Sequence, residues 1–468
     1  MSSQLIYPFS FGDRGQSDLL GGKGANLAEM VRIGLPVPPG FTITTEACQQ
    51  FLATGEVPKG LASEIDASLK VLEKSLDKEF GNPNKPLLVS VRSGAKFSMP
   101  GMMETVLNVG MTPEVTEQMA IRTGDPRFAW DSYRRFVDMY ARIVCDVPQA
   151  EFHKIENRVL ASFGAATIQE LEAEGLKSLA DGYKKVSEAL TGEIFPVDPR
   201  EHLMKSVEAV FHSWNSERAQ LYRRRERIPS DLGTAVNIQS MVFGNLSDDS
   251  GTGVAFTRNP ATGEQGSYGD YLQRAQGEDV VAGIRNTMSL AEFNELSPKV
   301  YGELDRVMTL LEDHYRDLCD IEFTVEEGKL WILQTRVGKR TAEAAFRIAI
   351  QLVDEGKISM DEALVRTSGD QLAQLMFPQF DLSGSTAPIA TGIPASPGAA
   401  VGEVVFDSRR AFDLARSGKK VILVRRETSP DDLVGMVASE GILTSRGGKT
   451  SHAAVVARGM GKTAVCGT

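Results

Sequence analysis

Residues 443–461 read LTSRGGKTSHAAVVARGMG, and this stretch carries His452, the last of the five histidines in the chain. Two glycines and two hydroxyl residues precede His452, and small apolar residues follow it. Thr450 or Ser451 is a suitable helix N-cap, and Gly459 is a suitable C-cap. The pattern therefore predicts a helix of about two turns, with the histidine in its first turn.

A histidine in the first turn of a helix has a particular chemistry. The unpaired N–H groups and the positive end of the helix dipole favour a neutral imidazole over imidazolium, and they stabilise an anion such as a phosphoryl group. The alternative is a histidine that packs at a helix start without a chemical role, as most histidines do. The glycine pair, the two hydroxyls and the small residues favour the first interpretation and make His452 a candidate nucleophile.

A second informative stretch, residues 320–336 (DIEFTVEEGKLWILQTR), predicts a β-hairpin. A two-residue turn would pair Glu322 with Leu333, whereas a three-residue loop over residues 327–329 pairs Glu322 with Gln334. We expect the three-residue loop, because it gathers the apolar side chains of the hairpin on one face: Ile321, Phe323, Val325, Trp331 and Leu333.

The opposite face of this hairpin then carries Glu322 and Gln334, with Asp320 and Arg336 at its open end. Carboxylate and amide oxygens beside a guanidinium suit Mg²⁺ held between the protein and nucleotide phosphates. The alternative is an ordinary polar face turned to solvent. Glu322 and Gln334 are the predicted metal ligands.

Near the N-terminus, residues 19–44 place three glycines around Lys23, where backbone amides and a point charge could approach a phosphate. A helix is predicted over 25–33 and a strand over 41–44. The stretch lacks the GxxxxGK[ST] pattern of a Walker A loop. Alone, it is equally compatible with a simple turn.

Residues 87–109 (LLVSVRSGAKFSMPGMMETVLNV) predict a buried strand over 87–91 that ends in Arg92, followed by a loop of Ser, Gly and Pro. An arginine at a strand end beside Ser93 and Lys96 suits a polyphosphate. The alternative is a surface arginine at a turn.

From about Thr112 to Pro196 the sequence is charge-rich, with apolar residues three and four apart, and predicts helices. Within it, Arg135 is most simply a solvated arginine on an amphipathic helix. Glu278 and Asp279 are adjacent carboxylates in a predicted loop, where a solvated pair is the usual outcome.

The composition narrows the class of protein. The 468 residues include 51 basic and 62 acidic side chains, a net charge of −11, which argues against a nucleic-acid-binding surface. Four cysteines without metal-ligand spacing indicate free thiols in a reducing compartment. We find neither a secretory signal nor an apolar run of roughly 18 residues. We therefore expect a cytoplasmic protein of about two to four domains, with no membrane or nucleic-acid partner.

The run GGxTSHAAVVARGMG resembles the phosphohistidine signature of the pyruvate, phosphate dikinase family, and SMPGMMETVLNVG, IEFT and LQTR resemble its nucleotide-binding part. Lys449 departs from the signature, which usually has methionine there. The resemblance implies Mg²⁺ as cofactor, His452 as the phosphate acceptor, and Thr450 as a target of a regulatory kinase and phosphatase, besides a plain capping role. It also implies the following contacts to ATP: Lys23, Arg92, Arg135, Glu278, Asp279, Asp320, Glu322, Gln334 and Arg336.

The resemblance and the composition together predict an α+β multidomain fold. We expect an ATP-grasp nucleotide-binding domain at 1–340, with a helical subdomain at 112–197 inserted in it. A helical connector at 341–380 and a linker rich in Gly, Ser, Pro and Ala at 381–392 follow. Residues 393–468 are predicted to form a swivelling phosphohistidine β/α domain that stops before it is complete.

The implied reaction converts ATP and inorganic phosphate to AMP, pyrophosphate and phosphohistidine. In the family, a C-terminal barrel domain then exchanges the phosphate with pyruvate and phosphoenolpyruvate, and we expect this barrel to be missing or separate. Two alternatives stay open: a phosphoenolpyruvate synthase type of enzyme in which water replaces phosphate, and a phosphocarrier or regulatory nucleotide-binding protein that acts with a separate partner.

Overall fold

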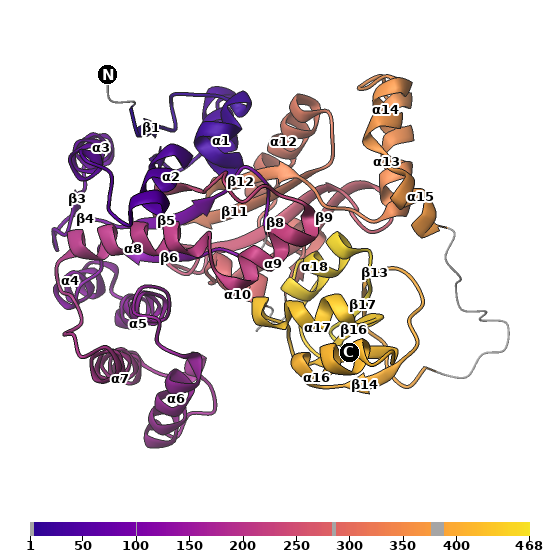
Figure 1. Ribbon diagram of the computed structural model, residues 1–468. Coiled ribbons are helices and arrows are strands. Elements are labelled where there is room, and N and C mark those ends of the chain that lie inside the picture. The colour runs from indigo at the N-terminus through magenta and orange to yellow at the C-terminus, as the bar shows by residue number, and fades with distance from the viewer. Residues whose placement is uncertain (1–3, 100, 283–286, 376–387) are drawn as a thin grey trace. The chain divides into compact units, whose positions relative to one another are not determined.

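A computed structural model describes residues 4–99, 101–282, 287–375 and 388–468. The chain divides into two compact units, Met1–Met241 and Val242–Thr468 (Figure 1). Most of the linker predicted over 381–392, and the end of the connector predicted over 341–380, lie outside the described residues. No helix within the described ranges is both long and apolar enough to cross a membrane.

Within the described residues, the first unit holds a five-stranded antiparallel sheet with the strand order β1-β2-β7-β5-β6. Its strands are β1 (Ile6–Pro8), β2 (Gly40–Ile43), β5 (Val89–Gly94), β6 (Thr105–Val109) and β7 (Ala235–Ser240). The last strand in sequence, β7, is the central one, and all its residues are buried. Arg92 lies inside β5 and is not its predicted last residue, because the pairing with β7 continues to Gly94.

The helices predicted from about Thr112 to Pro196 are confirmed. They gather at the lower left of Figure 1, where α5 packs against both α7 and β6. The helices of the first unit are α1 (Ser17–Arg32), α2 (Thr45–Thr54), α3 (Leu61–Leu76), α4 (Pro113–Thr123), α5 (Pro126–Ile143), α6 (Gln149–Phe163), α7 (Ala173–Thr191), α8 (Pro199–Ser213) and α9 (Glu217–Glu226).

The second unit contains, in its described part, another five-stranded antiparallel sheet, with the order β10-β9-β8-β11-β12. Its strands are β8 (Gly251–Arg258), β9 (Gln265–Gln273), β10 (Met288–Ser289), β11 (Cys319–Glu326) and β12 (Lys329–Val337). Helices α10 (Gly277–Ala282), α11 (Leu290–Leu296), α12 (Pro298–Tyr315), α13 (Ala342–Asp354), α14 (Met360–Arg366) and α15 (Gly369–Leu375) complete this part. Apolar residues of β8, β9 and α13 share one buried core.

The hairpin of β11 and β12 has the predicted pairing of Glu322 with Gln334, but its turn differs from the prediction. Glu326 pairs with Lys329, so only residues 327–328 form the turn, with φ angles of 49° and 74°. Positive φ at both central positions is the geometry of tight hairpin turns. The predicted three-residue loop is therefore wrong.

A β-bulge reconciles the short turn with the predicted pairing. The register shifts after Glu322, where Leu333 is the extra residue on β12 and Phe323 pairs with Ile332. Trp331 and Leu333, predicted to join the apolar face, are only partly buried. The buried apolar residues of the hairpin are instead Ile321, Phe323, Val325, Leu330 and Ile332.

A third sheet lies at the end of the chain and has the strand order β13-β17-β16-β15-β14. Its strands β14 (Glu403–Val405), β15 (Val421–Arg425), β16 (Gly441–Thr444) and β17 (Thr463–Cys466) are parallel, and β13 (Ile393–Ser396) is an antiparallel edge. Helices α16 (Ser408–Arg416), α17 (Leu433–Ala438) and α18 (His452–Met460) connect the parallel strands, as crossover helices do. The predicted mixed α/β character of the chain is confirmed.

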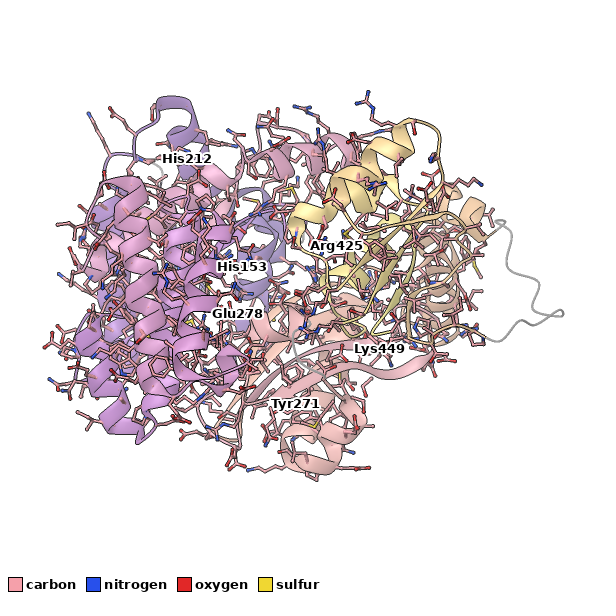
Figure 2. The ribbon with its side chains drawn as sticks, turned by 90° about the horizontal axis from the view of Figure 1, so that it is seen from below. His153, His212, Tyr271, Glu278, Arg425 and Lys449 are labelled. Carbon is pink, nitrogen blue, oxygen red and sulfur yellow. The ribbon has the colours of Figure 1, made fainter. Side chains whose placement is uncertain are left out.

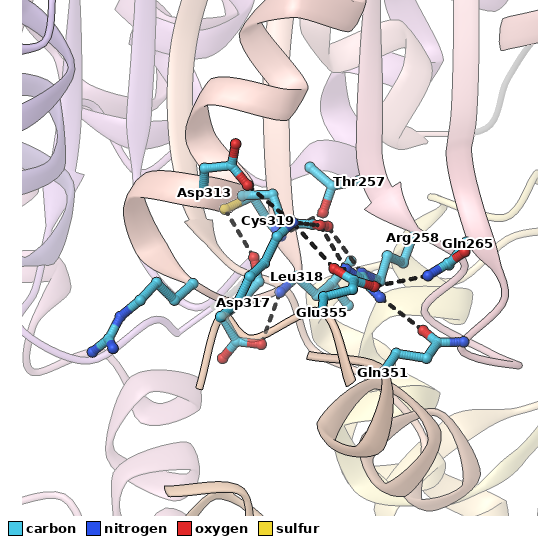
Figure 3. A network of polar contacts seen from close by, with 12 residues as sticks. Thr257, Arg258, Gln265, Asp313, Asp317, Leu318, Cys319, Gln351 and Glu355 are labelled. Carbon is cyan, nitrogen blue, oxygen red and sulfur yellow. Dashed lines mark hydrogen bonds and ion pairs between the residues drawn. The ribbon is translucent and has the colours of Figure 1, made fainter. Parts of the chain in front are cut away.

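A buried ion-pair network ties three elements of the second unit together (Figure 3). Arg258 at the end of β8 donates two hydrogen bonds to Glu312 of α12, at 2.7 and 3.0 Å. It also contacts Glu355 at 2.7 Å and Gln351 at 2.8 Å, at the end of α13. Lys357 adds ion pairs to Glu312 and Glu355, at 2.9 and 3.2 Å. The buried arginine therefore joins the sheet to two helices.

Candidate functional site

His452 is the first residue of α18, as the sequence predicts. Ser451 is the N-cap, and its hydroxyl accepts a hydrogen bond from the N–H of Ala454. The helix continues through Gly459, the predicted C-cap, and ends at Gly461, which has a left-handed φ of 62°. The prediction of the helix is confirmed and that of its C-cap is wrong, because the next glycine provides the left-handed residue.

The two ring nitrogens of His452 have different surroundings. Nδ1 lies 3.0 Å from the hydroxyl of Thr428, in the segment after β15. Nε2 is buried and has no hydrogen-bond partner among the described residues. Burial lowers the pKa of His452 to about 4, and the nearby charge of Asp431 only partly opposes this shift. The imidazole is therefore neutral near pH 7, with Nε2 left for chemistry.

Titration of His452 checks this electrostatic environment. Because the folded pKa of about 4 lies below the ordinary value of 6.5, the ring should stay neutral as the pH falls through 6.5. Only the unfolded chain then gains a proton, so this group makes the fold less stable as the pH drops from 6.5 towards 4. We expect the ring proton resonance, assigned with a His452→Gln variant, to titrate near pH 4. A midpoint at 6.5 or above contradicts the prediction.

Thr450 is not the helix cap, although the sequence allowed it. Its side chain is buried, and its hydroxyl donates to Oδ2 of Asp270 on β9, at 2.7 Å. The backbone N–H of Thr450 donates to the same oxygen, at 3.2 Å. The neighbouring Lys449, labelled in Figure 2 where the yellow ribbon meets the pink strands, lies with its ammonium 4.1 Å from the ring centroid of Tyr268.

The hairpin places the four predicted nucleotide and metal residues together at its open end. Glu322 lies opposite Gln334, and Asp320 lies opposite Arg336, whose Nε donates to Oδ2 of Asp320 at 2.8 Å. Oδ1 of Asp320 is buried without a hydrogen-bond partner in the part of the chain that the structure describes. Burial raises the pKa of Asp320, although Arg336 and, more weakly, Arg458 of α18 oppose the shift. The helix of His452 therefore approaches the same end of the hairpin.

The set Glu322 and Gln334 offers one carboxylate and one amide oxygen. Among the described residues, no group of three or more His, Cys, Asp or Glu side chains is placed to hold a metal. Mg²⁺ commonly uses only one or two protein carboxylates and completes its shell with water and phosphate oxygens. The two predicted ligands and the unpartnered oxygen of Asp320 fit that donor chemistry.

Glu278 and Asp279 lie in the first turn of α10, so the predicted loop is wrong. Asp279 is buried, and its carboxylate accepts a hydrogen bond from the backbone N–H of Gln276 at 2.9 Å. This contact caps the helix, because it satisfies one of the N–H groups that a helix start leaves unpaired. Glu278 is partly buried and labelled in Figure 2.

In the first unit, the glycine-rich stretch brings Lys23 next to β5. The helix predicted over 25–33 begins earlier, at Ser17, and is interrupted at Gly21, which has a φ of 66°. A Cβ atom on Gly21 would lie 1.5 Å from the carbonyl oxygen of Gly94, so only glycine permits this approach. Lys23 thereby lies beside β5, the strand that carries Arg92.

Arg135 lies on α5 and is mostly buried, so the solvated interpretation is wrong. Its Nε donates to Asp131 at 2.8 Å, and Arg134 binds the same carboxylate at 2.8 Å. Burial alone would raise the pKa of Asp131, but the charges of Arg135 and Arg134 lower it well below its usual range. The two guanidinium groups therefore share one buried carboxylate on α5.

The sequence did not identify Thr428 or Asp270. Thr428 stands in the run ETSPDD, which reads as a helix-capping segment, and nothing local connects it with a histidine 24 residues away. Asp270 lies 180 residues before Thr450. The sequence around it predicts only a strand with alternating side chains. Neither contact leaves a spacing pattern.

Comparison with known proteins identifies both parts of the chain. Residues 17–74, 53–294 and 287–357 match the family described as pyruvate phosphate dikinase, AMP/ATP-binding domain, and residues 418–468 match the mobile domain of PEP-utilising enzymes. Pyruvate, phosphate dikinase of Clostridium symbiosum is 51% identical over 469 residues, which are 99% of this chain and 54% of that protein. Pyruvate, phosphate dikinase 2 of Oryza sativa subsp. japonica is 53% identical over 98% of this chain and 52% of its own length.

A third relative gives the same result. Pyruvate, phosphate dikinase of Giardia intestinalis is 49% identical over 479 residues, which cover 100% of this chain and 54% of that protein. The chain thus spans about half the length of the curated relatives it matches. Since the AMP/ATP-binding family description matches far more than half of its residues, the chain belongs to the pyruvate phosphate dikinase family.

Proposed function

We propose that this chain phosphorylates His452 with ATP and inorganic phosphate, the nucleotide half-reaction of pyruvate, phosphate dikinase. The observation that carries the proposal is the state of His452 at the start of α18. Burial keeps its imidazole neutral, Thr428 engages Nδ1, and Nε2 has no hydrogen-bond partner among the described residues. A neutral imidazole whose Nδ1 makes a hydrogen bond can act as a nucleophile through Nε2.

The first step is attack of Nε2 on the β-phosphorus of ATP. The bond between this phosphorus and the oxygen bridging to the α-phosphate breaks, AMP leaves with that oxygen, and a pyrophosphoryl group stays on His452. The ring proton stays on Nδ1, which donates a hydrogen bond to the hydroxyl oxygen of Thr428. The N–H groups at the start of α18 stabilise the anion on the histidine.

In the second step, an oxygen of inorganic phosphate attacks the terminal phosphorus of the pyrophosphoryl group. The bond from this phosphorus to the bridging oxygen breaks, pyrophosphate leaves, and phosphohistidine remains. Catalysis in both steps rests on positioning and on charge neutralisation. Lys23, Arg92 and Arg336 are the proposed cations for this purpose.

Mg²⁺ is the proposed cofactor, and Glu322 and Gln334 are its proposed ligands. When bound, it neutralises charge on the nucleotide phosphates. Asp320 orients Arg336 through their 2.8 Å contact. Arg135, Glu278 and Asp279 remain proposed ATP contacts, and the ion pair of Arg135 with Asp131 and the capping bond of Asp279 would hold two of them in place.

The two antiparallel sheets and the matched family description support an ATP-grasp fold for residues 1–340, with the helical subdomain at 112–197. We assign residues 393–468 to a swivelling phosphohistidine domain, supported by the match at 418–468 to a mobile domain. Pyruvate and phosphoenolpyruvate are the proposed final partners, because the relatives, about twice as long, are named pyruvate, phosphate dikinase.

Incubation with ATP labelled at the β-phosphate tests the proposed reaction. We expect an acid-labile, base-stable label on the protein, and pyrophosphate only when inorganic phosphate is present. Orthophosphate released without added phosphate, and no pyrophosphate with it, would instead indicate a phosphoenolpyruvate synthase type of reaction with water. A protein that binds ATP but acquires no label would be a nucleotide sensor, and the proposal would be wrong.

Thr450 is the proposed site of regulatory phosphorylation by a kinase, reversed by a phosphatase. Its hydroxyl is held by Asp270, so modification requires this contact to open. A phosphate would carry about two negative charges beside that carboxylate and would repel ATP. We expect a Thr450→Glu variant to form phosphohistidine at least about tenfold more slowly, as like charges at close range imply. Labelling at the wild-type rate would rule this regulation out.

A further inference from the structure

Asp270 of β9 makes contacts that the proposed reaction does not use. The residue is 6% exposed. Oδ2 accepts the hydroxyl of Thr450 at 2.7 Å and its backbone N–H at 3.2 Å. Oδ1 accepts the hydroxyl of Thr287 at 3.0 Å. Both carboxylate oxygens are therefore occupied, and one of them by two groups of a single residue.

The contact extends over three consecutive residues of the segment between β16 and α18, which we call the catalytic loop (residues 445–451). A Cβ atom on Gly448 would lie 3.1 Å from Oδ2 of Asp270, so glycine permits a close approach of the loop to this carboxylate. Lys449 lies over the ring of Tyr268. Tyr268 and Asp270 are two residues apart on a strand and so point to the same face. The catalytic loop therefore contacts β9 through two adjacent residues, Lys449 on Tyr268 and Thr450 on Asp270.

The contact of the catalytic loop with β9 determines the position at which α18 begins. Thr450 directly precedes the N-cap, and the N-cap precedes His452. Gly447, with a φ of 104°, gives the upstream backbone a conformation that glycine adopts with little restriction. A loop with this freedom needs an anchor outside itself to hold its end in one position. The carboxylate of Asp270 is such an anchor, because it binds both the backbone and the side chain of Thr450.

We propose that Asp270 is a positioning residue for the phosphorylation of His452, and that it acts through Thr450. The proposal rests on the proposed function. By fixing the residue that precedes the N-cap, Asp270 sets the position of the attacking imidazole relative to the hairpin that carries Glu322 and Gln334. Its removal should therefore slow the transfer of the phosphoryl group without weakening the binding of ATP.

The first test compares Asp270→Asn with Asp305→Asn, the same chemical change at an exposed position of α12. Asparagine keeps the shape of the side chain but loses the charge and one acceptor oxygen. In single-turnover labelling at saturating ATP, we expect D270N to react about ten- to a hundredfold more slowly, the range that displacement of a reacting group by about 1 Å produces. The Kd for ATP should be unchanged, and D305N should match the wild type in both.

The second test asks whether the effect passes through Thr450. Thr450→Val removes the hydroxyl, so D270N should slow the reaction less in the T450V background than in the wild type. Thr450→Ser keeps both the hydroxyl and the backbone N–H as donors, so it should retain most of the wild-type rate of labelling. Hydrogen exchange without nucleotide provides a separate readout: we expect the amide of Thr450 to exchange at least about tenfold faster in D270N than in D305N, since its acceptor is weakened.

Three results would overturn the proposal: a D270N rate equal to that of the wild type, a loss of ATP affinity in place of a loss of rate, or fully additive effects of D270N and T450V. If D270N does not fold, a wild-type rate in T450V is sufficient to overturn it. A wild-type protein that forms no phosphohistidine contradicts the proposed function instead. In that case the hydrogen-exchange comparison still decides whether Asp270 holds the loop.

Discussion

Replacing His452 with glutamine is expected to abolish transfer of phosphate from ATP to the protein. Glutamine occupies a similar volume and keeps a polar group within reach of Thr428, but its amide nitrogen has no lone pair available for attack on phosphorus. Loss of a covalent nucleophile leaves no second path to the same product, so the decrease should exceed about 10⁴-fold. The base-stable label that the protein acquires from β-phosphate-labelled ATP measures this decrease.

The matched control is His153→Gln, because His153 is exposed on α6. This variant should label at the wild-type rate, and the His452 variant should still bind ATP with the wild-type Kd. A protein that carries the label without His452 would assign the acceptor to another side chain. Loss of label together with loss of ATP binding would indicate a damaged fold and would call for the smaller change His452→Asn.

Arg258→Gln is expected to lower the free energy of unfolding of the second unit by about 3 kcal/mol, the usual cost of removing one partner from a buried ion pair. Arg258 is the cation that pairs with both Glu312 and Glu355, and Figure 3 labels it beside Glu355. Lys357 remains and limits the loss. Hydrogen exchange of the amides of β8 and α12 in increasing denaturant measures the change in that unit directly.

Arg347→Gln is the control for this stability measurement. The ion pair of Arg347 with Glu343 spans 3.6 Å, and both side chains are about half exposed. Its removal should change the free energy of unfolding by no more than about 0.5 kcal/mol. Equal effects of the two substitutions would show that the Arg258 network does not stabilise the unit.

The pH dependence of the Arg258 network has a defined sign. The hydrogen bond from Arg258, with its charge and that of Lys357, lowers the pKa of Glu355 from 4.5 to about 2. A carboxylate with a lowered folded pKa stabilises the fold above its ordinary pKa and loses that contribution as the pH falls towards the folded value. The wild type should therefore lose stability between about pH 4.5 and 2, and Arg258→Gln should lose less.

The local sequence was sufficient where one element decides the outcome. The helix of His452, the helices after Thr112 and the pairing of Glu322 with Gln334 follow from caps, periodicity and alternation. The hairpin shows the limit of this reasoning, because a two-residue turn and a bulge at Leu333 give the same pairing as the expected longer loop. Periodicity does not reveal a bulge, since one inserted residue changes which apolar side chains share a face.

The parts of the site that the sequence missed depend on contacts between separate elements. Thr428 and Asp270 bind residues far along the chain, and their own neighbourhoods give no sign of it. Arg135 was misjudged as solvated for a related reason: amphipathic periodicity identifies the apolar face of α5, but the burial of its ion pair with Asp131 depends on what packs over it. Tertiary packing, and not local propensity, decides such positions.

The central position of β7 has a consequence for how the protein is made. Residue 235 must leave the ribosome before β2 and β5 can be joined, because β7 pairs with both of them. Until then, both strands present unpaired edges while all the helices from α4 to α9 are being synthesised. Such late, long-range closure slows folding and exposes nascent chains to aggregation. We therefore expect newly made chains to depend on chaperones that shield strand edges until the first sheet closes.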